Sequence, residues 1–155
     1  MSGPAIPTGS EGGPLRRPPG PQRKNDLMAP ESLTFTPIGY VENGFPLGTP
    51  GEVLKAAEAR IVIDPELVSG LDQLEREDRI LVIFHFHLSR DYELRQHPRG
   101  DTARPLRGVF ALRSPRRPNP IGVTEVELVE IQGNVLRVKG LDAVDHTPVL
   151  DLKPA

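Results

Sequence analysis

The chain has 155 residues, no cysteine and a formal net charge of −2 at pH 7. This length indicates one domain, and the absence of cysteine excludes a disulfide scaffold, a thiolate metal site and a cysteine nucleophile. Proline and glycine number 18 and 15 while apolar residues make up only 37%, so a polar, proline-rich segment dilutes an otherwise ordinary core.

The first thirty residues differ in composition from the rest of the chain. They contain seven prolines and five glycines, with few large apolar side chains. Such a segment buries too little apolar surface to offset the entropy lost on ordering. We therefore expect a disordered tail over residues 1–30 and one folded domain over residues 31–155.

Between residues 31 and 88, short β-forming runs alternate with turn signals. Asp64 and Pro65 stand where the N-cap and the first turn of a helix are expected. The run from Arg79 to His87 is the strongest strand signal, apolar on both faces at first, which indicates a central strand. These patterns predict strands within 33–41 and at 59–63 and 79–87, a loop at 44–56 and a short helix at 65–74.

The second half of the chain is also β-rich, apart from one long polar stretch. In residues 121–131 some apolar side chains fall on odd-numbered and others on even-numbered positions. This mixed parity indicates a bulge or a strand buried on one side only in part. The predicted elements are a loop at 88–107, strands at 108–112, 121–131, 135–141 and 149–153, and an irregular segment at 113–120. Six or seven short strands with one helix predict a mainly β fold, either a barrel or a sandwich.

Charge is distributed unevenly along the chain. Residues 90–117 contain eight arginines, three acids and no lysine, a net of +5, whereas residues 25–89 have a net of −7. Guanidinium groups bind phosphate or carboxylate through two parallel hydrogen bonds, so the arginine-rich segment is typical of anion or RNA recognition. The alternative is a solvated loop whose charge is balanced by the acidic part of the chain.

Two histidines stand near the end of the predicted central strand. His85 and His87 are two residues apart, which predicts that both point to the same face. They could bind a metal ion if a third ligand came from elsewhere, but no spacing identifies one. The alternative is a polar pair that binds a ligand by hydrogen bonds.

Two further segments hold polar groups in an arrangement typical of a site. Three prolines stiffen residues 113–120 and would hold Arg113, Arg117 and Asn119 in place. The segment has an alternative interpretation as a crossover whose prolines prevent edge pairing. Residues 141–154 carry several acids, of which Asp142 could accept a hydrogen bond or face a cation, although Asp and Thr before Pro are also ordinary turn formers.

Together these segments resemble the TrmO family, also called TsaA-like or YaeB-like proteins. The matching motifs are IFHFH at 83–87, GVFALRS at 108–114, RPNPIG at 117–122, and D-x-T-P-V-x-D-x-K-P at 145–154. The resemblance extends from about residue 35 to the end of the chain. It implies a small β-barrel that uses S-adenosylmethionine to methylate N6 of threonylcarbamoyladenosine next to the anticodon of threonine tRNA. It also implies a homodimer.

The resemblance also assigns roles to individual residues. The implied cofactor contacts are His87, Leu88, Arg113, Asn119, Val123, Leu141, Asp142, Ala143 and Val144. The arginine-rich segment and the basic C-terminal end supply the expected RNA contacts, which are Arg107, Arg116, Arg117 and Lys153. His85 is a candidate for the base that takes the proton from the target nitrogen, because histidine titrates near neutral pH.

The chain departs from the family pattern at residue 146, where His stands in place of the usual Gly. Glycine at that point indicates a turn with positive φ. No glycine-rich dinucleotide motif follows a first strand, which argues against a Rossmann methyltransferase. We expect no membrane span and a cytoplasmic location, since cysteine-free chains suit a reducing interior. The alternative functions are a metal-dependent enzyme using His85 and His87, and a binding module for S-adenosylmethionine or RNA without catalysis.

Overall fold

The computed structural model describes residue 3 and residues 32–155. The chain divides into two units, residues 1–34 and residues 35–155, and the second is compact and contains every helix and strand described below. The tail predicted for residues 1–30 therefore lies outside the described residues, apart from Gly3.

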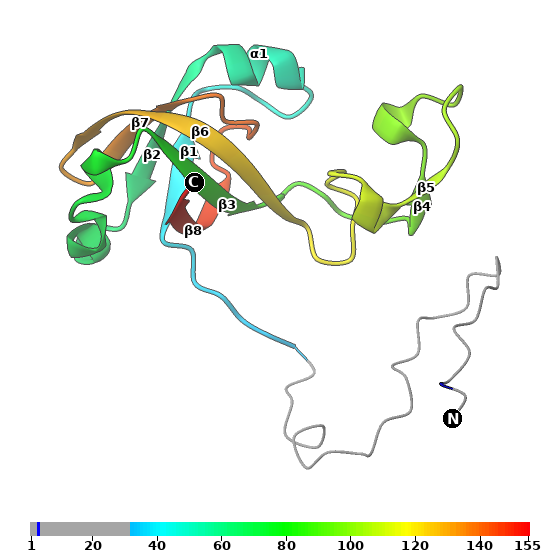
Figure 1. Ribbon diagram of the computed structural model, residues 1–155, viewed down its shortest axis with the longest axis horizontal. Coiled ribbons are helices and arrows are strands. Elements are labelled where there is room, and N and C mark those ends of the chain that lie inside the picture. The colour runs from blue at the N-terminus through cyan, green and yellow to red at the C-terminus, as the bar shows by residue number, and fades with distance from the viewer. Residues whose placement is uncertain (1–2, 4–31) are drawn as a thin grey trace. The chain divides into compact units, whose positions relative to one another are not determined.

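The second unit is built around a closed antiparallel β-barrel (Figure 1). Its six strands follow one another in the order β1-β2-β7-β6-β3-β8. The mainly β fold and the barrel are confirmed. The strands are β1 (Gly39–Glu42), β2 (Glu58–Ile63), β3 (Arg79–His85), β6 (Ile121–Gln132), β7 (Val135–Lys139) and β8 (Pro148–Pro154).

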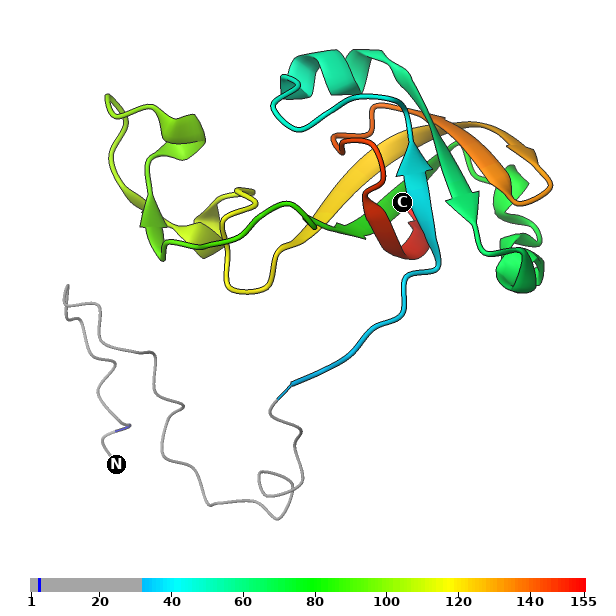
Figure 2. The same ribbon diagram turned by 180° about the vertical axis from the view of Figure 1, so that it is seen from behind.

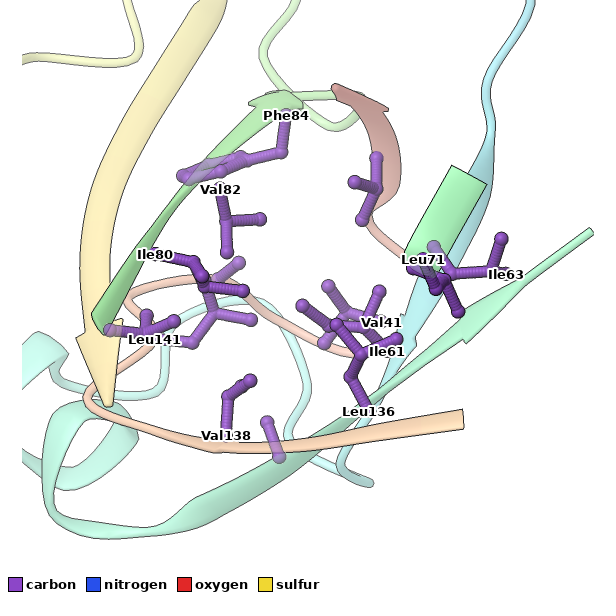
Figure 3. Packing of buried hydrophobic residues seen from close by; sticks show 14 residues of the cluster. Val41, Ile61, Ile63, Leu71, Ile80, Val82, Phe84, Leu136, Val138 and Leu141 are labelled. Atoms are coloured by element: carbon purple, nitrogen blue, oxygen red, sulfur yellow. The ribbon is translucent and has the colours of Figure 1, made fainter. Parts of the chain in front are cut away.

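Alternate side chains of these strands fill the barrel interior. In β3, Ile80, Val82 and Phe84 are buried, because successive side chains of a strand point to opposite faces. Ile61 of β2 and Leu136 of β7 belong to the same cluster (Figure 3). Full burial of one such side chain contributes roughly 1.5–3 kcal/mol. The barrel interior is therefore the main source of stability in this unit.

Strand β6 carries the predicted bulge. Its register with β7 shifts between Leu128 and Glu130. Before the shift the even-numbered Val126 and Leu128 pack on the core, and after it the odd-numbered Ile131 does so. One extra residue reverses the parity of the strand, which explains the mixed apolar pattern in the sequence.

The start of the barrel differs from the prediction. The strand predicted within residues 33–41 begins only at Gly39, and residues 33–38 form no strand. Pro37 has no N–H to donate to a ladder. The N–H of Ile38 already donates to the carbonyl of Val149 at 2.8 Å, so pairing with β8 begins directly after this proline.

Short helices occur between the strands. The predicted helix is present as the 3-10 helix η2 (Pro65–Leu71), and the Asp64 side chain accepts a hydrogen bond from the N–H of Glu66 as the N-cap prediction requires. A second 3-10 helix, η3 (Leu74–Arg76), follows. The loop predicted over 44–56 is wrong at its end, where α1 (Gly51–Ala56) forms. Helices this short are marginal in isolation, so the burial of Leu54 supports α1.

Residues 88–120, between β3 and β6, form a projection from the barrel that we call the arginine lobe (Figures 1 and 2). The strand predicted at 108–112 is wrong. Only two residues pair on each side, and the chain then turns into a 3-10 helix that buries Val109 and leaves Phe110 exposed. The elements of the lobe are β4 (Arg95–Gln96), η4 (Pro98–Gly100), β5 (Arg107–Gly108) and η5 (Val109–Ala111).

No helix within residues 32–155 has the length and apolar character needed to cross a membrane.

Candidate functional site

A cavity of about 540 Å³ opens where the chain leaves β3 and enters the arginine lobe; we call it the first cavity. Its walls come from the α1 region, the turn after β3, residues 113–120 before β6, which we call the proline-rich loop, and the segment between β7 and β8. The apolar part of the wall includes Leu47, Leu54, Phe84, Phe86, Leu88 and Val144. The charged and titratable part is His87, Arg90, Asp91, Arg113, Arg116 and Asp142.

The first cavity brings together residues that are more than fifty positions apart in the sequence. Six of the residues predicted as cofactor contacts line it, namely His87, Leu88, Arg113, Asp142, Ala143 and Val144. They come from three segments that the barrel places side by side, because β3 pairs with β6 on one edge and with β8 on the other.

The other predicted contacts do not line the first cavity. Val123 of β6 borders a smaller adjoining cavity of about 180 Å³, which shares Arg113 and Asp142 with the first. Leu141 is buried in the barrel core. Asn119 is exposed, and its carbonyl accepts a hydrogen bond from the N–H of Ile121 at 2.7 Å. The candidate base His85 is half-buried at the end of β3, beside the first cavity but not in its wall.

His87 lies beyond the strand rather than on it. β3 ends at His85, and the N–H of His87 turns back to donate to the carbonyl of His85 at 2.8 Å. The alternation that would place both rings on one face therefore does not extend to His87. Burial lowers the pKa of His87 below 6.5, and the nearby charges of His85 and His146 lower it further. His87 is therefore neutral at pH 7.

Residues 32–155 offer no third ligand for the two histidines. Among the described residues, no three His, Cys, Asp or Glu side chains converge closely enough to hold a metal ion. The metal-dependent alternative therefore gains no support from this part of the chain.

The predicted RNA contacts have separate surroundings. Arg116 is held by Asp91 and Glu93, with nitrogen–oxygen distances of 3.0 Å to each carboxylate. Arg117 donates to the carbonyls of Leu112 and Ser114 at 2.9 and 3.2 Å, so it stabilises its own loop. Arg116 and Arg117 thus shape the proline-rich loop.

The other two predicted RNA contacts lie on different parts of the unit. Arg107 is exposed on β5 of the arginine lobe. Lys153 lies on β8 opposite Leu81, toward the start of β3 and away from the lobe, and pairs with Asp151 at 2.8 Å. The barrel therefore does not bring all four predicted RNA contacts together.

Gln96 is a structural residue that the sequence did not reveal. Its side chain is nearly buried, and its amide donates to the carbonyls of Glu93 at 2.7 Å and Arg116 at 2.6 Å. These bonds fasten β4 to the proline-rich loop. A single glutamine in a polar stretch carries no sequence signal for such a role, because the partner carbonyl lies twenty residues away.

The turn that borders the first cavity has the strained conformation that the sequence indicates. His146 has φ of 65°, a left-handed conformation that glycine adopts readily and other residues adopt infrequently. The turn is held by the N–H of Asn43, which donates to the Asp145 carboxylate at 2.9 Å. This hydrogen bond is the main reason that the pKa of Asp145 is lowered. The neighbouring residues Val144 and Thr147 are thereby fixed in the cavity wall.

The chain is similar to proteins of one known family. The family model for the tRNA-methyltransferase O N-terminal domain matches residues 42–155. The chain belongs to this family. The matched region includes every residue that lines the first cavity and the whole arginine lobe.

Its relatives include both short and long proteins. A probable S-adenosyl-L-methionine-binding protein of Methanothermobacter thermautotrophicus is 40% identical, with 82% of this chain and 93% of that protein covered. A mouse tRNA (adenine(37)-N6)-methyltransferase is 36% identical, covering 79% of this chain but 31% of that protein. The crystal structure of TrmO from Pseudomonas aeruginosa matches with a TM-score of 0.61 and 30% identity, covering 80% of this chain and 56% of that one. The chain thus spans a little over half the length of that solved structure.

Proposed function

We propose that this TrmO N-terminal domain binds S-adenosylmethionine in the first cavity and methylates an RNA adenine. The observation that carries the proposal is that one cavity is lined by six residues to which the family resemblance gives this role. The names of the relatives support the same ligand.

The size and the lining of the first cavity fit this ligand. A volume of about 540 Å³ lies within the ~300–1,000 Å³ of small-molecule sites. Phe84 and Phe86 form an edge-to-face pair with ring centres 5.1 Å apart, which provides an aromatic wall for a planar base. When bound, S-adenosylmethionine supplies an activated methyl group.

The charged residues suit the two ends of the ligand. The Asp142 carboxylate is half-exposed and lies 3.8 Å from the Lys55 ammonium, so it remains able to face a second cation such as the sulfonium. Within residues 32–155, Arg113 forms no ion pair, and its guanidinium can bind the ligand's carboxylate. Neutral His87 adds no positive charge to a cavity that receives a cationic ligand.

The chain holds these groups rigidly. Besides the bonds of Gln96 and Arg117, the hydroxyl of Ser89 donates to the carbonyl of Pro115 at 2.9 Å. Methyl transfer requires an in-line approach of the acceptor nitrogen, and preorganised positions contribute more to such a step than covalent chemistry does.

The acceptor nitrogen must also lose a proton. We propose His85 as the residue that accepts it, with His87 as the alternative because its ring lines the first cavity. At saturating S-adenosylmethionine, His85→Ala should abolish methyl transfer while leaving cofactor affinity intact. Persistent transfer in this variant, with loss in His87→Ala, would move the role to His87.

The finer parts of the proposal rest on the family resemblance. The acceptor is N6 of threonylcarbamoyladenosine beside the anticodon of threonine tRNA, and the active form is a cytoplasmic homodimer. The name of the mouse relative, a tRNA (adenine(37)-N6)-methyltransferase, supports a tRNA adenine as the acceptor.

Calorimetric titration of the purified chain with S-adenosylmethionine tests the proposal. We expect micromolar binding, about −8 kcal/mol, weakened at least tenfold in Arg113→Ala. The matched control is Arg76→Ala, an exposed arginine of η3 outside this cavity, which should bind like the unmodified chain. Absence of binding by the unmodified chain would refute the proposal, whereas binding without transfer to any tRNA would identify a non-catalytic binding module.

A further inference from the structure

A second cavity of about 750 Å³ lies between the arginine lobe and the α1 side of the barrel. Five cationic side chains and two carboxylates, Glu93 and Asp142, line it. The cations are Lys55, Arg99, Arg104, Arg113 and Arg116. The second cavity adjoins the first, since Arg113, Pro115, Arg116 and Asp142 belong to both.

The two carboxylates neutralise only part of this charge. Glu93 pairs with Arg116 at 3.0 Å, and Asp142 lies 3.8 Å from Lys55. Within residues 32–155, Arg99 forms no ion pair, and Arg104 has only a long contact of 3.7 Å to Asp101, which is outside the cavity wall. The cavity therefore presents uncompensated guanidinium groups, which are the groups that bind phosphate through paired hydrogen bonds.

A hydrogen bond between His97 and Arg104 closes the loop that carries Arg99 and Arg104. Nδ1 of His97 lies 2.7 Å from the carbonyl of Arg104, and a carbonyl only accepts, so Nδ1 carries the proton and Nε2 is left to the cavity. Arg99 has φ of 53° and Gly100 has φ of 71°, so the chain reverses within this loop. Arg99, at the tip of the loop, and Arg104, at its closing end, both line the second cavity.

We infer that the second cavity binds a phosphate group of the RNA strand whose target base enters the first cavity, an inference that rests on the proposed function. The adjoining walls place a phosphate site next to a base site, as successive groups of one strand require. Arg99 and Arg104 are the contacts, and Arg113 lies between the two cavities.

Exposed aromatic rings on the lobe favour a strand over a free phosphate ion. Phe110 is 69% exposed and Tyr92 is 56% exposed, although aromatic rings are usually buried. Phe110 directly precedes Ala111 and Leu112, which line the second cavity. Unpaired bases of RNA stack on such rings, whereas inorganic phosphate has no group that would use them.

The test measures binding of a fluorescein-labelled RNA hairpin that carries the anticodon loop of threonine tRNA, as a function of salt. Arg99→Ala and Arg104→Ala should each weaken binding about tenfold at low salt. Each should also reduce the slope of log K against log salt by roughly 0.7–0.9, the change for one lost phosphate contact. Phe110→Ala should weaken binding on the order of tenfold with the slope unchanged, because stacking releases no counterions. Arg76→Ala is the matched control and should change neither quantity.

Each outcome has a distinct meaning. An unchanged salt slope in both arginine variants would overturn the phosphate site. Two results together would assign the cavity to free phosphate and overturn the strand. Inorganic pyrophosphate would compete equally well with Phe110→Ala and with the unmodified chain, and Phe110→Ala would leave the hairpin affinity unaffected. A change in sedimentation of Phe110→Ala with normal RNA binding would show that the ring belongs to a protein interface, and would also count against the strand. S-adenosylmethionine titration of the same proteins reports separately on the proposed function.

Discussion

The neighbours of individual side chains decide which charges are available at this site. Arg116 and Arg113 are three residues apart, yet Arg116 is held by two carboxylates while Arg113 forms no ion pair within residues 32–155. His87 is likewise set by its surroundings, since burial and two other histidines lower its pKa. The first cavity therefore combines two guanidinium groups that form no ion pair within residues 32–155, Arg90 and Arg113, with the Asp142 carboxylate and one neutral imidazole.

The lowered pKa of His87 predicts a pH dependence of ligand binding. The folded chain keeps His87 neutral at pH 7, and acidification through its pKa, below 6.5, places a positive charge beside a ligand that is itself a net cation. Affinity for S-adenosylmethionine should therefore fall as the pH is lowered below 6.5. The measurement is the Kd from titrations between pH 5 and pH 8.

His87→Gln should remove most of this pH dependence, because glutamine does not titrate. His97→Gln is the matched control, since His97 lines the second cavity and not the first. An equally steep decline in His87→Gln would assign the dependence to another group.

At the scale of elements, the pairing of β3 with β6 builds the aromatic wall of the first cavity. Phe84 lies opposite Gly122 in this ladder. A Cβ at residue 122 would lie 2.5 Å from the Phe84 ring and 2.8 Å from the Phe86 ring. Phe84 is only 2% exposed and cannot move aside, so the two rings occupy the space that a side chain on β6 would take.

Gly122→Ala should therefore disturb both stability and binding. Overpacking of this kind costs about 1–3 kcal/mol in the free energy of unfolding, and the displaced rings should weaken S-adenosylmethionine binding. Urea denaturation and calorimetry measure the two effects. Gly70→Ala is the matched control, because a Cβ there meets no atom within 4 Å, and its stability should stay within about 0.5 kcal/mol of the unmodified chain. Equal stability of the two variants would contradict this account of the wall.

At the scale of the whole second unit, the buried core belongs almost entirely to the barrel. Its buried side chains come from the strands, from Leu71 of η2, and from Leu141 and Ala143 between β7 and β8 (Figure 3). In the arginine lobe, Val109 is the one large apolar side chain among residues 88–120 that is buried. The lobe is held instead by a two-residue ladder and by side-chain bonds such as those of Gln96.

Hydrogen exchange should consequently separate the lobe from the barrel. Amides of β4 and β5 should exchange through local opening, at a lower free energy than those of β3 and β6, which should require global unfolding. Native-state exchange at increasing denaturant, followed by mass spectrometry or NMR, measures both. A common opening free energy for the two regions would show that the lobe unfolds only with the barrel.

The features that depend on local periodicity could be predicted from the amino-acid sequence. The runs 79–87 and 135–141 predicted two strands, which the structure contains over Arg79–His85 and Val135–Lys139, and the mixed apolar pattern of residues 121–131 indicated the bulge that β6 carries. The motifs also indicated the family. Each of these features is expressed by residues that lie next to one another in the chain.

Other features depend on contacts between residues that are distant in the sequence, and these features could be seen only in the folded chain. α1 forms where Leu54 becomes buried in the wall of the first cavity, and residues 109–111 turn into a 3-10 helix because no strand continues beside them. The pairing of Arg116 and the fastening by Gln96 join residues about twenty positions apart. The free energy of these contacts comes from groups that the fold brings together, so no local pattern records it.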